Sequence, residues 1–139
     1  MEQDKQQLKI LSIFHYVVGG LAALIACIPI IHLTIGIGML TGNLFGESLP
    51  TDEAFPFTLF GLAFTILPAI MILAGWAYAV GMIVAGNFLV KERNYVFCLV
   101  MAAISCAFTP FGTVLGVFTI VVLMRPTVKQ LFNYPSPTK

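Results

Sequence analysis

Residues 54–90, AFPFTLFGLAFTILPAIMILAGWAYAVGMIVAGNFLV, contain no Asp, Glu, Lys or Arg. A helix needs roughly 20 apolar residues to cross a bilayer, so this stretch is far longer than one span requires. Residues 10–46 and 94–124 also lack these four residue types. Of the 139 residues, 59% are apolar and 9% are charged, whereas soluble domains carry about 25% charged residues. We therefore predict an integral membrane protein. A soluble domain, a disordered chain, a disulfide-rich secreted module and a nucleic-acid partner are excluded.

The charged residues fall in four clusters, at 2–9, 47–53, 91–93 and 125–139. Three spans would distribute the basic residues over both sides of the membrane. A turn at residues 109–112 divides the last apolar stretch in two, because Pro110 and Gly112 suit the second and fourth positions of a type I turn. All seven Lys and Arg residues then lie on one side, and the loop at 41–56, with three acidic residues, lies on the other. The positive-inside rule places both termini in the cytoplasm.

The predicted fold is an all-α integral membrane four-helix bundle, with spans at about 10–40, 57–90, 95–109 and 112–125. As a helix, the second span measures about 51 Å and the third about 22 Å, against a hydrocarbon core of roughly 30 Å. We therefore expect a long hairpin beside a short one, and spans three and four either cross the membrane fully or form a re-entrant loop.

Three prolines are expected to shape the helices. Pro29 and Pro68 should kink the two long spans, since each removes a backbone hydrogen bond. Pro126 suits the first turn of a short C-terminal helix at 126–133. Val128, Leu131 and Phe132 would form its apolar face, which is typical of a helix lying in the membrane interface.

Small residues recur at intervals of four, a spacing that lets helices approach closely in lipid. The candidate helix-packing and oligomer positions are Gly19, Ala23, Ala77, Gly81, Ala85, Gly112 and Gly116. Packing within one chain and contact between subunits both explain this pattern.

Polar side chains within the predicted spans are few. His15, His32, Asn87 and Trp76 are the candidates for a pore or ligand site. The two histidines are separated by about 25 Å along a helix, so they cannot bind the same metal ion or haem iron. The three cysteines lack metal-ligand spacing, and no nucleophile has a base with an acid to orient it. We predict no catalytic residue, no metal and no cofactor.

Three functions fit this pattern. The first is a non-enzymatic, homo-oligomeric scaffold or accessory subunit, in which another copy or a membrane-protein partner covers the apolar surface that the lipid bilayer does not. The second is an oligomeric pore or small-solute carrier lined by His15, His32 or Asn87. The third is a lipid- or quinone-binding protein that uses Trp76 and four phenylalanines, Phe55, Phe57, Phe60 and Phe64.

Residues 110–132, PFGTVLGVFTIVVLMRPTVKQLF, resemble the ends of small uncharacterised multi-pass bacterial inner-membrane proteins. Residues 11–24, LSIFHYVVGGLAAL, show the same resemblance. It implies a bacterial inner-membrane location and several spans, and it implies no activity and no functional residue.

Overall fold

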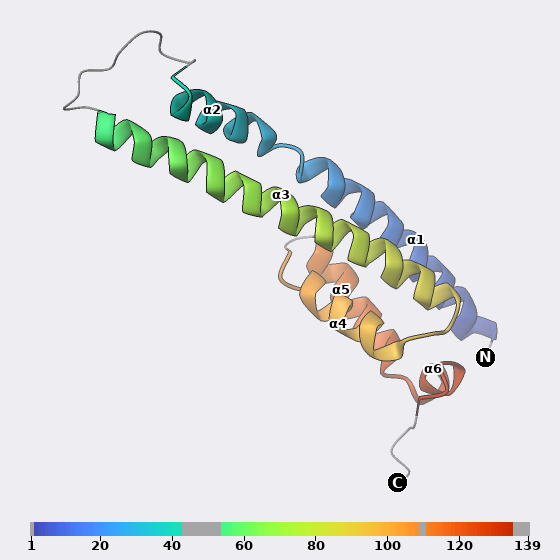
Figure 1. Cartoon of the computed structure of the whole chain (residues 1–139). Helices are drawn as coiled ribbons and strands as arrows, with labels where there is room; N and C mark the ends of the chain where they lie inside the picture. The colour runs from blue at the N-terminus through green and yellow to red at the C-terminus, as the bar shows by residue number, and fades with distance from the viewer. Residues whose placement is uncertain (1, 43–53, 109–110, 135–139) are drawn as a thin grey trace. The chain divides into compact units, whose positions relative to one another are not determined.

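The computed structural model describes residues 2–42, 54–108 and 111–134 (Figure 1). These residues form helices and connecting turns, with no strand among them, which confirms the predicted all-helical class. The helices are α1 (Glu2–Ile25), α2 (Ile30–Leu40), α3 (Ala54–Val90), α4 (Tyr95–Ser105), α5 (Phe111–Leu123) and α6 (Pro126–Leu131). The predicted turn at Pro110 and residues 43–53 of the predicted outer loop lie outside the described residues.

Two helical segments, Glu2–Leu40 and Thr58–Val90, are long and apolar enough to cross a membrane. In each, only 11% of the most apolar window is buried within the chain. The core helix of a soluble protein would bury most of such a window. Most apolar side chains in these two windows are therefore not covered by other residues of the chain.

The two prolines act differently on their helices. A turn at residues 26–29 separates α1 from α2, and there the Ile28 amide donates to the Ile25 carbonyl three residues earlier, at 3.0 Å. Helix α2 then starts with the Leu33 amide donating to the Pro29 carbonyl, also at 3.0 Å. By contrast, α3 continues through Pro68 without a break. The first predicted span is thus two helices, and the second is one.

The chain divides into two compact units. The first contains residues 1–21 and 78–139, and the second contains residues 22–77. Each unit is described separately below.

In the first unit, the beginning of α1 packs against the end of α3. The Ser12 hydroxyl donates to the Gly86 carbonyl at 2.7 Å. A Cβ atom at Gly19 would lie 3.2 Å from the Ala79 carbonyl oxygen. The two backbones therefore approach closely at both positions, as small residues allow.

Helices α4 and α5 lie side by side in this unit (Figure 1). A Cβ atom at Gly112 would be 2.6 Å from the Ser105 carbonyl oxygen, and one at Gly116 would overlap the Ala102 carbonyl oxygen. The Thr113 hydroxyl donates to the Cys106 carbonyl at 2.9 Å. These contacts make α4 and α5 a tight helical hairpin.

Charged residues from separate parts of the sequence meet in the first unit. Lys5 Nζ lies 3.6 Å from Glu92 Oε1, and Arg125 Nη1 lies 3.8 Å from Asp4 Oδ1. Arg125 also donates to Gln7 Oε1 at 2.9 Å. The start of α1, the α3–α4 connection and the end of α5 are therefore adjacent.

Helix α6 turns its apolar side toward its own chain. Val128 is fully buried and Phe132 nearly so. The Phe132 ring meets the Tyr95 ring edge-on, with centroids 5.8 Å apart, and Tyr134 stacks on the same tyrosine at 4.5 Å. Two of the three residues predicted to face the membrane interface are thus buried within the chain, and one of them, Phe132, packs on the first turn of α4.

Candidate ligand pocket between two prolines

The second unit is a pair of contacting helical segments. Helix α2 approaches α3 closely at Gly36, where a Cβ atom would be 2.6 Å from the Phe64 carbonyl carbon and 2.7 Å from its oxygen. Nearer the turn, a Cβ atom at Gly75 would be 2.6 Å from the Ala26 Cβ. Glycine is required at both positions because any side chain would push the segments apart.

The carbonyl that Gly36 approaches is the one that a regular helix would pair with residue 68. Because Pro68 has no N–H, it cannot donate to the Phe64 carbonyl. The ring of a proline also crowds that carbonyl. Close packing of α2 at Gly36 covers this weakened turn of α3, where the helix continues without a break.

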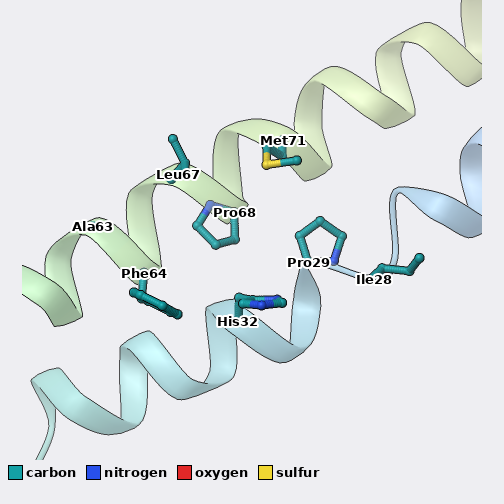
Figure 2. Close-up of a pocket in the computed structure, with 8 residues that line it drawn as sticks. All are labelled: Ile28, Pro29, His32, Ala63, Phe64, Leu67, Pro68 and Met71. Carbon is teal, nitrogen blue, oxygen red and sulfur yellow. The ribbon is translucent and has the colours of Figure 1, made fainter. Parts of the chain in front are cut away.

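A pocket of about 410 Å³ lies beside this contact (Figure 2). Pro29 and Pro68 lie on its two sides, Pro29 as the last residue of the turn that follows α1 and Pro68 in the middle of α3. Its volume falls within the range of roughly 300–1,000 Å³ that is usual for small-molecule sites. The full lining is Ile28, Pro29, His32, Ala63, Phe64, Leu67, Pro68 and Met71.

The pocket is lined almost entirely by apolar residues. The rings of His32 and Phe64 lie near one another, with centroids 6.0 Å apart and planes inclined by 31°. The two residues come from the two helices that enclose the pocket, His32 from α2 and Phe64 from α3 (Figure 2). His32 is the single lining residue with a polar side chain, and its ring makes no hydrogen bond to any described residue. The pocket can therefore offer an imidazole to a ligand and otherwise only apolar contact.

The four predicted pore or ligand residues have different environments. His15 is fully buried, whereas His32 and Asn87 are exposed. Trp76 is half exposed. No hydrogen bond or ring contact within the described residues joins any two of them. Only His32 lies in the pocket.

The His15 imidazole is held by its own helix. Its Nδ1 lies 2.9 Å from the Leu11 carbonyl oxygen. A carbonyl only accepts, so Nδ1 carries the proton. The other ring nitrogen, Nε2, is buried and has no hydrogen-bond partner among the described residues.

A buried polar pair between α3 and α4 was not among the predicted site residues. The Tyr78 hydroxyl donates to Ser105 Oγ at 3.1 Å, and Ser105 Oγ donates to the Met101 carbonyl at 2.8 Å. The Tyr78 ring also stacks on Phe108 with centroids 4.4 Å apart. The sequence marks Tyr78 only as a polar aromatic residue in mid-span, because its partner is 27 positions away. The pair satisfies both hydroxyls and so explains a tyrosine inside an apolar helix.

Most of the predicted small-residue positions pack within the chain. Gly19, Gly112 and Gly116 face neighbouring helices as described above, Gly81 contacts Met101, and Ala85 is fully buried. Ala23 is partly buried, and Ala77 is exposed. Within the described residues, no group of three or more His, Cys, Asp and Glu side chains is placed to hold a metal ion.

In comparisons with known proteins, no family model matches the chain, and no curated protein or solved structure shows significant similarity to it.

Proposed function

We propose that the protein is a non-enzymatic, multi-pass membrane protein that assembles with copies of itself and serves as a scaffold or accessory subunit. One observation carries the proposal. The exposed apolar side chains of α3 extend over more of the helix than a bilayer can cover.

These side chains extend from Leu59, which is 59% exposed, to Val90, which is 52% exposed. The interval is about 46 Å along a helix, against a hydrocarbon core of roughly 30 Å. A straight helix would need a tilt of about 50° to bury it all, and observed tilts reach about 40°. Some of this apolar surface must therefore be covered by protein. A second copy of the chain has the same uncovered apolar surface on its own α3.

The charged contacts support the direction in which α3 crosses. Lys5 with Glu92, and Arg125 with Asp4, bring three of the four charge clusters together. The fourth cluster, at 47–53, contains only acidic charges. The positive-inside rule then favours a cytoplasmic position for the Val90 end of α3. The apolar surface of α3 that the bilayer leaves uncovered then lies at the Leu59 end of the helix, on the outer side.

Helices α4 and α5 fit a re-entrant hairpin better than two full spans. They contain 11 and 13 residues, about 16 and 20 Å as helices, and neither length reaches across the hydrocarbon core. Polar groups near the tip, such as Tyr78 and Ser105, are paired with each other. That pairing supports irregular backbone at membrane depth, which is tolerated where protein covers it.

Native mass spectrometry of the full chain, released from lipid nanodiscs, tests the assembly. We expect a defined oligomer for the wild type. The double variant Leu59→Ala/Phe60→Ala should shift the distribution toward monomer, because it removes exposed apolar surface at the Leu59 end of α3. The matched double variant Ile70→Ala/Leu73→Ala removes exposed surface in the lipid-covered part and should remain oligomeric. A wild type that is wholly monomeric, or equal effects of the two double variants, would overturn the proposal.

A further inference from the structure

Basic side chains gather where the start of α1 meets the end of α3, on the side that the proposed function places in the cytoplasm. This inference rests on that placement. Lys5 pairs with Glu92 at 3.6 Å. Lys91 and Arg93 flank Glu92 in sequence and are exposed. Lys9, also exposed, lies one helical turn after Lys5, about 6 Å along α1. Lys9, Lys91 and Arg93 form no ion pair with any described residue, so the Lys5–Glu92 contact brings three unpaired cations to one place.

The acidic residues of this unit do not neutralise the group. Asp4 pairs with Arg125. Glu2 lies seven residues before Lys9, about 10 Å along the helix, and makes no ion pair with the residues that the structure describes. With Glu2 counted beside Glu92, two acidic residues still face four basic ones. A surplus of positive charge therefore remains at this end of α1 and α3.

The cations lie at the boundary of the apolar stretches. Lys9 directly precedes residues 10–46 and Lys91 directly follows residues 54–90, and neither stretch contains a charged residue. In the proposed placement, Lys9 and Lys91 thus mark the level at which the hydrocarbon begins. Lipid phosphates lie at this level, and anionic lipids attract basic residues there.

An exposed apolar strip lies between α1 and α3 below these cations. Tyr16 Cε1 lies 3.3 Å from where a Cβ atom at Gly86 would be, and Ile83 Cγ1 lies 3.2 Å from the equivalent point at Gly19. Tyr16 and Ile83 are nevertheless 41% and 43% exposed. These two side chains, which we call the α1–α3 strip, therefore lie at the edge of the helix contact and are open to lipid.

Asn87 lies between the cations and the α1–α3 strip. It is exposed and comes one turn after Ile83, and the Lys91 amide donates to its backbone carbonyl at 3.1 Å. Its side-chain amide makes no hydrogen bond to a described residue. An amide about 6 Å inside the hydrocarbon boundary is unfavourable unless it is hydrogen-bonded. The order of cation, amide and apolar strip matches the phosphate, ester and acyl chain of a phospholipid.

We propose that this surface binds one anionic phospholipid of the cytoplasmic leaflet. Lys9, Lys91 and Arg93 hold its phosphate. An ester carbonyl accepts a hydrogen bond from the Asn87 amide, and an acyl chain lies along the α1–α3 strip. The unpaired cations select an anion, and the strip selects one that has an apolar chain. A zwitterionic lipid matches less well, because its own cation already neutralises its phosphate.

Native mass spectrometry of the full chain tests the charged contact. The protein is released from nanodiscs that contain equal amounts of phosphatidylglycerol and phosphatidylcholine, and the retained lipid is identified by its mass. We expect one phosphatidylglycerol per chain. Lys9→Gln/Lys91→Gln should lower its retention about fivefold for each charge removed, whereas Lys9→Arg/Lys91→Arg should retain it.

A second double variant provides the matched control. Lys129→Gln/Lys139→Gln removes the same number of charges from the C-terminal segment. Lys129 lies one turn after Arg125, which contacts Gln7, and Gln7 lies on the opposite side of α1 from Lys9 because two residues span about 200° of helix. This variant should keep its phosphatidylglycerol. Equal loss in the two glutamine variants, or equal retention of both lipids by the wild type, would overturn the proposal.

Photolabelling tests the position of the acyl chain. Phosphatidylglycerol and phosphatidylcholine carry the same diazirine in the acyl chain, and the readout is the ratio of adducts on Ile83 to adducts on Val117. Both residues are exposed, and each lies eight positions before a basic residue, Lys91 or Arg125. The ratio should be higher for phosphatidylglycerol and should fall to the phosphatidylcholine value in Lys9→Gln/Lys91→Gln. Equal ratios for the two lipids would refute binding at the strip.

Variants of Asn87 test the ester contact. Asn87→Leu should weaken retention of phosphatidylglycerol about fivefold, the effect of losing one hydrogen bond, whereas Asn87→Gln keeps the donor and should remain close to wild type. Equal retention by the three proteins would contradict this contact. Displacement of the lipid by glycerol 1-phosphate as readily as by short-chain phosphatidylglycerol would assign the cations to a soluble anion and overturn the lipid proposal.

The assembly proposal and the lipid proposal fail separately, because they concern opposite ends of α3. Native mass spectra report the oligomer and the retained lipid as independent mass differences. A monomer that retains phosphatidylglycerol would refute the assembly and support the lipid site. An oligomer without retained phosphatidylglycerol would refute the lipid site and leave the assembly in place.

Discussion

At the scale of single residues, the polar atoms inside the apolar helices are paired almost entirely with backbone carbonyls. Ser12 donates across to α3, and Thr65 and Thr119 donate to the carbonyl four residues earlier in their own helices, each at 2.7 Å. Among the buried polar side-chain atoms of the described residues, the exception is His15 Nε2, which has no hydrogen-bond partner. An unpaired buried acceptor loses its hydration without compensation, so His15 is a source of instability within the first unit.

Replacing His15 with leucine should therefore leave the free energy of unfolding unchanged or raise it by about 1 kcal/mol, because an apolar side chain of similar size removes the unpaired nitrogen. His15→Ala should lower it by about 2 kcal/mol or more, since it leaves a cavity. Reversible unfolding in detergent, followed by circular dichroism, measures both. If leucine proves as damaging as alanine, Nε2 has a partner, and a role for His15 in a pore or ligand site would regain support.

The burial of His15 was predictable from helical spacing, although we treated it as a site candidate. Leu8, Ser12, His15 and Gly19 recur at intervals of three and four, and all are buried. Such a stripe marks one face of a helix. His32 could not be placed in the same way, because the pocket forms only when a break at residues 26–29 brings it opposite α3.

At the scale of helices, close approach depends on a few glycines that meet backbone directly. Gly36 is the clearest case, since a Cβ atom there would meet both atoms of the Phe64 carbonyl as well as the Thr65 hydroxyl. Gly20, on α1, has no atom within 4 Å of where a Cβ would be. The two glycines thus differ in surroundings while both lie within helices.

Gly36→Ala should destabilise the α2–α3 contact by about 1–3 kcal/mol, the usual effect of overpacking. Gly20→Ala is the control and should be neutral or stabilising by up to about 1 kcal/mol, because alanine favours helix more than glycine does. Thermal unfolding of the protein in nanodiscs distinguishes them. Equal stability of the two variants would contradict the close contact at Gly36.

The long stretches without charged residues predicted the helical class, and the span predicted at 57–90 falls within α3. Residues 54–90 are apolar throughout, so neither the packed face of α3 nor its partner could be identified from them. Both Pro29 and Pro68 were expected to kink their helices, and the helical pattern is interrupted at the turn that contains Pro29 but continues through Pro68. The difference depends on neighbouring packing at Gly36 and Phe64, which is tertiary and leaves no periodic signal.

At the scale of the whole molecule, the positions of the charged residues bear on the topology more than the net charge does. The net charge is +1, yet the residues that carry the charges are grouped. Contacts from Lys5 to Glu92 and from Arg125 to Asp4 join groups that are distant in sequence. The sequence predicted this grouping through the positive-inside rule, which depends on charge alone. It did not predict the individual pairs, since these depend on how the fold brings the start of α1 to Glu92 and Arg125.

Cysteine accessibility tests the resulting topology. In a variant whose three native cysteines are replaced by alanine, Glu47→Cys should react with a membrane-impermeant thiol reagent applied to intact cells. Lys139→Cys should react only after the membrane is permeabilised, because an even number of crossings leaves both termini in the cytoplasm. The cysteine-free protein is the control for background. Labelling of position 139 from outside would show that the chain does not turn back at Pro110.

The division of the chain into units has a consequence for biosynthesis. Residues 22–77 form a continuous segment, so that unit can assemble as soon as its two helices leave the ribosome. The other unit joins residues 1–21 to residues 78–139, and Arg125 meets Asp4 and Gln7 across more than a hundred positions. Asp4 and Gln7 at the start of α1 therefore lack their partner until Arg125 has been synthesised, when translation is nearly finished. During that interval the nascent chain is most exposed to quality-control proteases, and slowing elongation after residue 78 should lower the yield of folded protein.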